Sequence, residues 1–325
     1  MEKKSSLRRS IPVAVALIIA FIIPLVIEDE YYLHTFIISG IYVLLVLGLN
    51  LILGYTGQLS LGHAAFYGIG AYTSTLLVMN LHFSFWLALP CSGLAAGTAG
   101  LLLGFPALRL KGAYLVICTL AFVEIVHQIF MSWESLTRGP MGIPGVPSPQ
   151  NISIGNILID FSEKQTYYYL VLVIVLISLL LNFFLIRSKT GRAFIAIRED
   201  QIAAGIMGIN LTFYKLTAFY SACFLAGIAG SLYVHYIGFV SPESFTLGES
   251  INIVVMTIAG GMGTLIGPLI GAIGMTFLLE FMRALAEYRM LIYGIILMVL
   301  IVVLPEGAIG GIDILRRNLR KPQKI

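Results

Sequence analysis

The chain has 325 residues, of which 58% are hydrophobic and only 11% are charged, with a formal net charge of +4. A soluble domain carries roughly a quarter charged residues, so this composition excludes an ordinary water-soluble protein and requires a surface that faces lipid. Apolar stretches of about 20 residues, the length that crosses a bilayer as a helix, recur from residue 11 to residue 304. The sequence therefore predicts an all-α polytopic membrane protein with a single transmembrane domain, 1–325.

The first apolar segment, 11–27, follows a basic N-terminus and imitates a secretory signal peptide. Its apolar core is longer than the usual core of about 7–15 residues, and Glu28-Asp29-Glu30 stands where a cleavage site of small residues would be. We therefore expect an uncleaved first transmembrane helix.

About ten apolar segments are predicted to cross the membrane. The run 251–283 is too long for one ordinary crossing, and Gly260-Gly261-Met262-Gly263 divides it. A re-entrant half-helix over 251–264 is the alternative and leaves nine crossings. The ten predicted segments are 11–27, 36–53, 61–79, 85–104, 113–130, 167–186, 213–234, 251–264, 266–283 and 291–304.

Basic residues orient these segments, because Lys and Arg gather in cytoplasmic loops. The clusters lie at the N-terminus, in the loop from Arg187 to Arg198, and in the tail after Arg316. Ten crossings place all three clusters inside, whereas nine leave the tail outside. We therefore expect both termini in the cytoplasm. The polar segments 131–166 (extracytoplasmic) and 187–212 (cytoplasmic) suggest one docking event on each face.

The 33 glycines require an explanation. Many stand four residues from another small residue, a spacing that lets helix backbones approach closely. Tight helix packing is the interpretation for most of them. The pairs are Gly93/Gly97, Gly100/Gly104, Ala226/Gly230 and Gly267/Gly271.

Two denser glycine clusters, Gly54–His63 and Gly260–Gly267, each contain G-x-x-G-x-L between two predicted spans. Many transporters have two related halves whose broken helices flank the substrate path, although chance also explains so short a repeat. Backbone groups that lack helical hydrogen bonds at membrane depth must line a cavity or be buried in protein. We expect the translocation path near these clusters, with His63 read as a packing residue at a helix start rather than a metal ligand. The candidate path residues are Gln58, Ser60, Gly62, His63, Gly260, Gly261 and Gly263.

Glu124 and His127 share one face of the segment 113–130, with Gln128 beside them. A charge at membrane depth is costly enough to suggest a function, and Glu124 is added to the candidate path residues. The alternative is a structural pair turned into the bundle.

The sequence offers no catalytic, cofactor or metal site. Cys91, Cys118 and Cys223 lie in apolar stretches, as buried small side chains do. No cluster has metal-ligand spacing, and Lys189-Thr190 lacks the preceding glycines of a phosphate-binding loop. The prediction is a transport protein rather than an enzyme, without a nucleic-acid partner, in which any ATP and Mg are bound by a partner subunit.

Residues Glu199–Ile209 are predicted to form a short amphipathic helix, punctuated by glycine and flanked by basic residues, that projects from the membrane. A solvated loop helix is the alternative interpretation.

Seven segments resemble the permeases of the high-affinity branched-chain amino acid importers, specifically the LivM-type subunit. They occur in one order along nearly the whole chain: GYTGQLSLGHAAFYGIGAYTS at 54–74, LRLKGAYLVICTLAFVEIV at 108–126, TRGPMGIPG at 137–145, RSKTGRAFIAIREDQIAAGIMGIN at 187–210, YVHYIGFVSPESFTLGESI at 233–251, AGGMGTLIGPLIGA at 259–272 and LPEG at 304–307. His127 departs from the family, in which arginine is more frequent, so its role stays open.

The resemblance implies a location in a bacterial inner membrane and a heterodimeric pore with a sister permease of the LivH type. It also implies two cytoplasmic ATPases and an extracytoplasmic solute-binding protein. It implies Leu, Ile and Val as substrates; related importers carry urea, short amides or other amino acids, and an ion-coupled secondary transporter is the rival class. It also implies that the cytoplasmic segment couples to an ATPase through Glu199, Asp200, Ala203, Ala204, Gly205 and Gly208.

Overall fold

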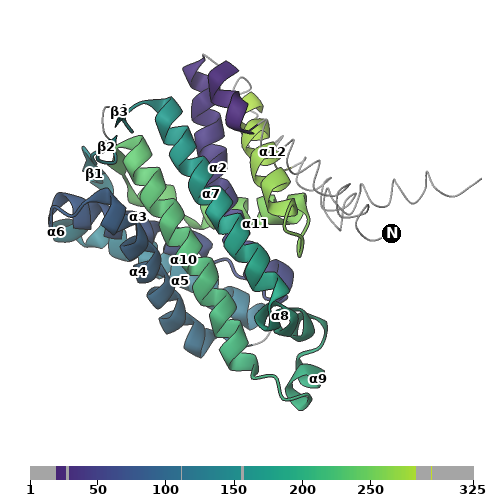
Figure 1. The fold of residues 1–325 in the computed structure, drawn as a ribbon. Helices are drawn as coiled ribbons and strands as arrows, with labels where there is room; N and C mark the ends of the chain where they lie inside the picture. The colour runs from purple at the N-terminus through teal and green to yellow at the C-terminus, as the bar shows by residue number, and fades with distance from the viewer. Residues whose placement is uncertain (1–19, 27–28, 111, 155–156, 283–293, 295–325) are drawn as a thin grey trace, which may run out of the picture.

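The computed structural model describes residues 20–26, 29–110, 112–154, 157–282 and 294, and these are mostly helical (Figure 1). The long helices form one bundle, and short strands and turns lie at one end of it. The helices are α2 (Glu30–Asn50), α3 (His63–Met79), α4 (Phe85–Ala107), α5 (Ala113–Ser132), α6 (Glu134–Thr137), α7 (Lys164–Arg187), α8 (Lys189–Glu199), α9 (Gln201–Ile206), α10 (Leu211–Ile237), α11 (Leu247–Gly260) and α12 (Gly267–Phe281).

Each predicted span from 36–53 to 266–283 corresponds to one of these helices within a few residues. Most of the predicted span 11–27 and nearly all of 291–304 lie outside the described residues. Among the residues that the structure describes, five helices are long and apolar enough to cross a membrane, the first of them running from Glu30 to Tyr55. The prediction of a predominantly α-helical polytopic membrane protein is confirmed, whereas the count of ten crossings stays a prediction.

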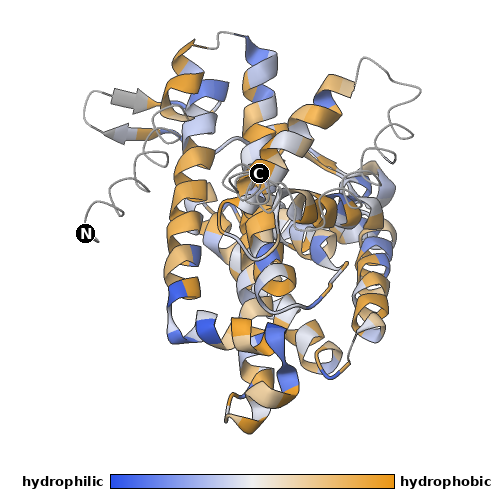
Figure 2. Ribbon diagram, turned by 90° about the vertical axis from the view of Figure 1, so that its right-hand side faces the viewer, coloured by the Kyte–Doolittle hydropathy of each residue, from blue (hydrophilic) through white to orange (hydrophobic). Residues whose placement is uncertain are grey.

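Helices α2 and α10 form the centre of the bundle. Their most apolar windows are 72% and 67% buried, against 28–39% for α4, α5 and α7. Large apolar side chains are exposed on the outer faces of α4 and α7 and on part of that of α5. Long stretches of hydrophobic ribbon are visible in Figure 2. This arrangement suits a protein whose outer surface contacts lipid and other membrane subunits.

Glycines allow α10 to pack closely against its neighbours. A Cβ added to Gly97 or Gly100 would lie 2.7 Å from Tyr220 or 2.6 Å from Cys223 of α10. On the other side of α10, a Cβ at Gly230 would collide with backbone atoms of α3. The interpretation of these spacings as tight helix packing is confirmed.

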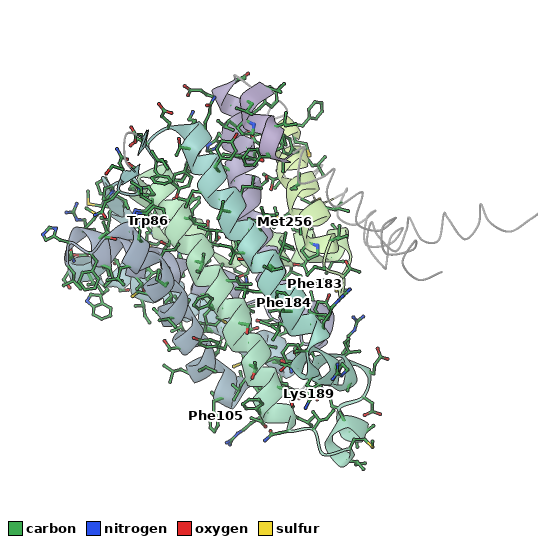
Figure 3. All side chains as sticks on the ribbon, in the orientation of Figure 1. Trp86, Phe105, Phe183, Phe184, Lys189 and Met256 are labelled. Carbon is green, nitrogen blue, oxygen red and sulfur yellow. The ribbon has the colours of Figure 1, made fainter. Side chains whose placement is uncertain are left out.

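Aromatic residues and arginines gather at the end of the bundle that carries α8 and α9. Arg109 lies 5.0 Å from the ring centre of Phe105, and Arg187 lies 4.1 Å from that of Phe183. Figure 3 shows Phe105 at the same end of the molecule as Lys189, the first residue of α8. Aromatic and basic side chains of this kind favour the boundary between membrane and water.

The segment 131–166, predicted as a loop, lies at the opposite end and contains short elements. Besides α6 it holds a 3₁₀ turn (Gly139–Met141) and the strands β1 (Ile143–Pro144), β2 (Ile152–Ile154) and β3 (Ile157–Ile159). Strand β1 pairs antiparallel with β4 (Phe239–Val240), which follows α10, and β2 pairs with β3. His235 of α10 further joins this segment to the bundle through a 2.6 Å hydrogen bond between its Nδ1 and the backbone oxygen of Pro147.

Helices α11 and α12 form a hairpin that breaks where the sequence predicts it. Gly261 and Gly263 have φ values of 113° and 73°, a region that favours glycine, and Pro268 stands in the first turn of α12. The 14 residues of α11 extend about 21 Å, less than the roughly 30 Å of a hydrocarbon core. The hairpin therefore reaches into the bundle beside α2, which packs against both of its helices.

Candidate functional site

The two glycine clusters of the sequence meet in space. A Cβ on Gly54 would collide with the backbone nitrogen of Gly263, so only glycine permits this approach. The buried amide of Asn50 joins the clusters: its Oδ1 accepts from the Gly263 nitrogen at 2.9 Å, and its Nδ2 donates to the Thr264 oxygen at 2.8 Å. We call residues 54–57 and 260–264 the glycine junction. One amide side chain thus supplies the donor and the acceptor that the broken α11–α12 backbone lacks.

The first half of the glycine junction is made by an irregular end of α2. Residues Leu51–Tyr55 continue α2 as a π-helix, a form that is rare and frequently marks functional sites. Gly57 then reverses the chain with a φ of 69°. The carbonyl groups at the end of this 26-residue helix carry its negative partial charge.

Arg198, the second-last residue of α8, reaches this helix end. Its Nη1 donates to the backbone oxygen of Gly54 at 2.5 Å. A Cβ on Gly57 would lie 3.2 Å from the Arg198 Cγ, and a Cβ on Gly263 would lie 2.5 Å from Nη1. The arginine side chain, although exposed along part of its length, therefore fits into a space that glycines of both clusters leave open.

Helix α8 packs directly on the π-helix. Its Phe194 is fully buried in a small apolar cluster with Leu51 and Tyr55 of the π-helix and Ala218 of α10. Ser188 caps α8 by accepting from the backbone nitrogen of Thr190 at 3.1 Å. The helix is thus held as a rigid unit against the end of α2.

The structure corrects the prediction of one helix over Glu199–Ile209. Helix α8 ends at Glu199, Asp200 is extended with a φ of −155°, and α9 covers only Gln201–Ile206. The carboxylate of Asp200 causes the break, because it accepts from the backbone nitrogens of Ile202 (2.7 Å) and Ala203 (3.1 Å) and so caps a new helix.

Helix α9 forms an exposed apolar tip at the end of the molecule opposite β1–β3 (Figure 1). Ile202, Ile206 and Met207 are 70%, 81% and 82% exposed. Gly208 ends this helix with a φ of 85° and donates to the backbone oxygen of Gly205. Of the six predicted coupling residues, Ala204 is buried, whereas the others are exposed: Glu199, Asp200, Ala203, Gly205 and Gly208.

A pocket of about 500 Å³ lies between the glycine junction and the start of α5. Gln58, which borders it, is 5% exposed, and its Nε2 has no hydrogen-bond partner among the described residues. Lys215 of α10 and Gln201 also line the pocket, and Lys215 Nζ donates to Gln201 Oε1 at 2.9 Å. The remaining lining residues are mostly apolar: Gly57, Leu59, Leu110, Gly112, Ala113, Leu115, Val116 and Ile117.

Other predicted path residues lie inside the chain rather than at this pocket. Ser60 is buried and accepts from the backbone nitrogen of Gly62 at 3.3 Å. His63 begins α3 and is 1% exposed, in keeping with its interpretation as a packing residue at a helix start. Gly260 and Gly261 are buried at the α11–α12 break.

The face of α5 that carries Glu124 points out of the bundle. Glu124, Gln128 and Ser132 are exposed at intervals of four residues, and Gln128 Nε2 donates to Ser132 Oγ at 3.1 Å. The alternative of a Glu124–His127 pair turned inward is therefore wrong. His127 lies beside this polar stripe, and its buried Nε2 has no partner in the described part of the chain. An exposed carboxylate within a span requires protein or water beside it, because lipid does not solvate it.

Three residues of this region were not among the predicted site residues: Asn50, Arg198 and Lys215. In the sequence, Arg198 is one member of a cluster of basic residues, and Asn50 is a polar residue in an otherwise apolar span. A polar amide inside such a span is a usable signal, because it requires partners there. The roles of Arg198 and Lys215 depend on contacts with residues 144 and 14 positions away, which no local pattern reveals.

A helical membrane bundle with broken helices that meet at glycines is typical of transport proteins of the permease class. Residues 31–304 match the family model described as "Branched-chain amino acid transport system / permease component". The chain belongs to this family. No solved structure matches the chain.

Curated relatives agree with this assignment. The chain is 39% identical to the high-affinity branched-chain amino acid transport system permease protein LivM of Salmonella typhimurium, over 82% of this chain and 67% of that protein. LivM of Escherichia coli K12 is also 39% identical, over 83% of this chain and 68% of the relative. LivH of Salmonella typhimurium, from the same kind of transport system, is 25% identical over 84% of this chain and 92% of that protein.

Proposed function

We propose that the chain is one of two permease subunits of an ATP-driven importer for Leu, Ile and Val in a bacterial inner membrane. Family membership and the relatives named LivM support the transport of branched-chain amino acids. The similarity to both LivM and LivH supports a pore made from two related permeases. The single observation that carries the coupling to ATP is the exposed apolar tip of α9, which is joined through α8 to the glycine junction.

The proposed orientation has ten crossings and both termini in the cytoplasm. It puts α8 and α9 inside the cell, together with Arg109 and Arg187, and the segment 131–166 outside. The clustering of arginines and of aromatic side chains at the α8 end supports this orientation. The outer segment then receives a solute-binding protein loaded with an amino acid.

Helix α9 docks on one of two cytoplasmic ATPases, which bind ATP and Mg. A short helix with exposed Ile202, Ile206 and Met207 suits insertion into an apolar groove of a partner. Glu199 and Asp200 lie beside this tip. Asp200 positions α9 by capping it, and the exposed carboxylate of Glu199 offers a charged contact to the ATPase. A permease moves substrate against a gradient only if another reaction biases its conformations, and ATP binding and hydrolysis supply that bias.

The substrate path runs between this chain and the sister permease, along the exposed face of α5. Glu124 on that face offers a carboxylate to the substrate ammonium group, and apolar neighbours such as Ile117 and Ile125 accept the branched side chain. Gln58 lines the pocket at the cytoplasmic end of the path, near Lys215. The remaining predicted path residues pack behind the residues that face this path: Ser60, Gly62, His63, Gly260, Gly261 and Gly263.

Reconstitution of the complex tests this function. The permease pair, the two ATPases and the loaded solute-binding protein are placed in proteoliposomes, and uptake of labelled leucine is measured with and without ATP. We expect uptake only when every component and ATP are present, with competition by isoleucine and valine. Competition by urea or acetamide instead would reassign the substrate, and leucine accumulation by the chain alone on an ion gradient would identify a secondary transporter.

A further inference from the structure

We propose that Arg198 is the positioning residue that transmits motion of the α8–α9 segment to both broken helices at the glycine junction. This inference rests on the proposed function, because it concerns how an ATPase bound at α9 moves the membrane-embedded helices. Arg198 lies between the two parts: it is in the last turn of α8, two residues before the cap of α9, and its Nη1 contacts the backbone oxygen of Gly54 at 2.5 Å.

The space that receives the guanidinium group is shaped by glycines from both clusters. A methyl group at Gly263 would lie 2.5 Å from Arg198 Nη1, and one at Gly57 would lie 3.2 Å from Cγ. Both glycines have positive φ values, 73° and 69°, so a side chain at either position would also strain the backbone. Side chains on either cluster would exclude the guanidinium from this position.

The acceptor is also suited to a cation. The Gly54 oxygen belongs to the π-helical end of the 26-residue helix that α2 begins. Helix ends of this kind concentrate negative partial charge on their carbonyl oxygens, and a hydrogen bond from an ionised donor is stronger than one between neutral groups. The Arg198 contact therefore holds α8 to α2 by charge as well as by packing.

The second cluster is tied to the same point by Asn50. Asn50 stands one turn before Gly54 and bonds to the backbone of Gly263 and Thr264 at 2.9 and 2.8 Å. A displacement of Arg198 therefore acts on the end of α2 directly and on the α11–α12 hairpin through Gly263. Two broken helices that are far apart in the sequence thus share one link to the segment outside the membrane.

Helix α8 has the properties of a rigid arm behind this link. Phe194 anchors it against the π-helix, while Asp200 provides an extended residue between α8 and α9. Packing alone would let α8 slide over the apolar surface of Leu51 and Tyr55, because apolar contacts have no fixed direction. The directional bond from Arg198 fixes its register on α2.

The test compares Arg198→Ala with Arg198→Lys and with the control Arg192→Ala in the complete reconstituted complex. Arg192 lies on the same helix with its side chain exposed, and its bond to the Arg187 oxygen is 3.5 Å long. The measured quantity is the number of leucine molecules transported per ATP hydrolysed. Loss of a hydrogen bond from a charged donor changes an equilibrium by about tenfold or more, so we expect this ratio to fall about tenfold in Arg198→Ala.

A purely structural role would not separate transport from hydrolysis. We expect Arg198→Ala to bind both ATPases and to hydrolyse ATP at the rate of the unaltered complex, with leucine transport reduced about tenfold. Arg198→Lys, which keeps a charged donor, should restore part of the ratio, and Arg192→Ala should leave it unchanged. In the Arg198→Ala background, Gly263→Ala should reduce the ratio little further, because both changes break the same contact.

Two results would overturn the proposal while leaving the proposed function intact. One is an unchanged ratio in Arg198→Ala, and the other is a complex that loses its ATPases or unfolds when Arg198 is replaced. If instead the unaltered complex shows no ATP-dependent leucine uptake, the proposed function itself fails.

Discussion

The guanidinium group of Arg198 donates a 2.5 Å hydrogen bond to the backbone oxygen of Gly54, 144 residues earlier in the chain. This contact joins a helix outside the bundle to the irregular end of the most enclosed helix. It occurs where two glycine clusters meet and where Asn50 completes the hydrogen bonds of a broken backbone. The coupling that we propose between α8 and the membrane-embedded helices therefore depends on a few residues.

Asn50→Ala should destabilise the protein. The substitution leaves the Gly263 nitrogen and the Thr264 oxygen without their bonds to the Asn50 amide, and each unsatisfied buried group costs about 1–3 kcal/mol. Asn182→Ala is the matched control, because the Nδ2 of buried Asn182 bonds to the Ser178 oxygen of its own helix and, within the described residues, to no other element. Thermal unfolding in detergent should show a clearly larger loss for Asn50→Ala; equal losses would contradict the bridging role of Asn50.

Gly227→Ala should weaken the contact of α10 with α4 and α3. The new methyl group would collide with the backbone oxygen of Ser92 and lie 2.7 Å from the Ala96 Cβ. Overpacking of this kind costs roughly 1–3 kcal/mol. Gly274→Ala in α12 is the control, since nothing lies within 4 Å of its added Cβ. The midpoint of thermal unfolding should fall only for Gly227→Ala, and a fall of the same size in Gly274→Ala would refute the close approach.

Ile206→Glu should prevent association with the ATPase without disturbing the membrane-embedded helices. Ile206 is among the most exposed apolar side chains, so the unbound chain loses little packing when it is replaced. A charge buried without a partner in an apolar groove is strongly unfavourable. Copurification of tagged ATPase should drop at least about tenfold. Ile195→Glu, exposed on α8, is the control, and full copurification with Ile206→Glu would show that α9 is not the docking helix.

Gly208→Val and Glu199→Lys should uncouple uptake from ATP while leaving the membrane-embedded helices folded. Gly208 has a φ of 85°, and valine at a left-handed position costs about 1–2 kcal/mol, enough to unwind the end of α9. Gly145→Val is the control for ATPase copurification, because Gly145 has a similar φ of 77°, likewise meets no atom within 4 Å and lies at the opposite end of the molecule. The measurements are leucine uptake and ATPase copurification; if both stay at the unaltered level in Gly208→Val and Glu199→Lys, the coupling role is lost.

Glu124→Cys should react with a membrane-impermeant thiol reagent in the assembled transporter. Glu124 lies on the exposed polar stripe of α5, which we assign to the aqueous path. Leu181→Cys on the apolar face of α7 is similarly placed in a span and 60% exposed, but should face lipid and stay unlabelled. Cys91, Cys118 and Cys223 are replaced by alanine beforehand. Labelling of Leu181→Cys and protection of Glu124→Cys would reverse the assignment of the two faces.

The sequence by itself determined the spans within the described residues and the break between α11 and α12. Lipid offers no hydrogen bonds to a backbone, so a run of apolar residues such as 213–234 must be helical whatever its neighbours are. Gly260–Gly263 likewise breaks the helix locally through its backbone freedom. The close packing of α4 on α10 was also readable from glycines at fixed spacing, because that spacing repeats on one helix face.

Only the tertiary structure decided how these helices use their polar groups. Helix packing decides that Gly54 meets Gly263, that Arg198 bonds to the Gly54 oxygen and that Glu124 points outward. None of these contacts produces a periodic pattern in the sequence. The break between α8 and α9 was missed because the Asp200 carboxylate competes with a continuous helix, a balance of about 1 kcal/mol that helix propensity alone does not settle. The hydropathy of each residue determines where a span forms. These contacts instead join backbone and side-chain groups that come together only when the helices pack.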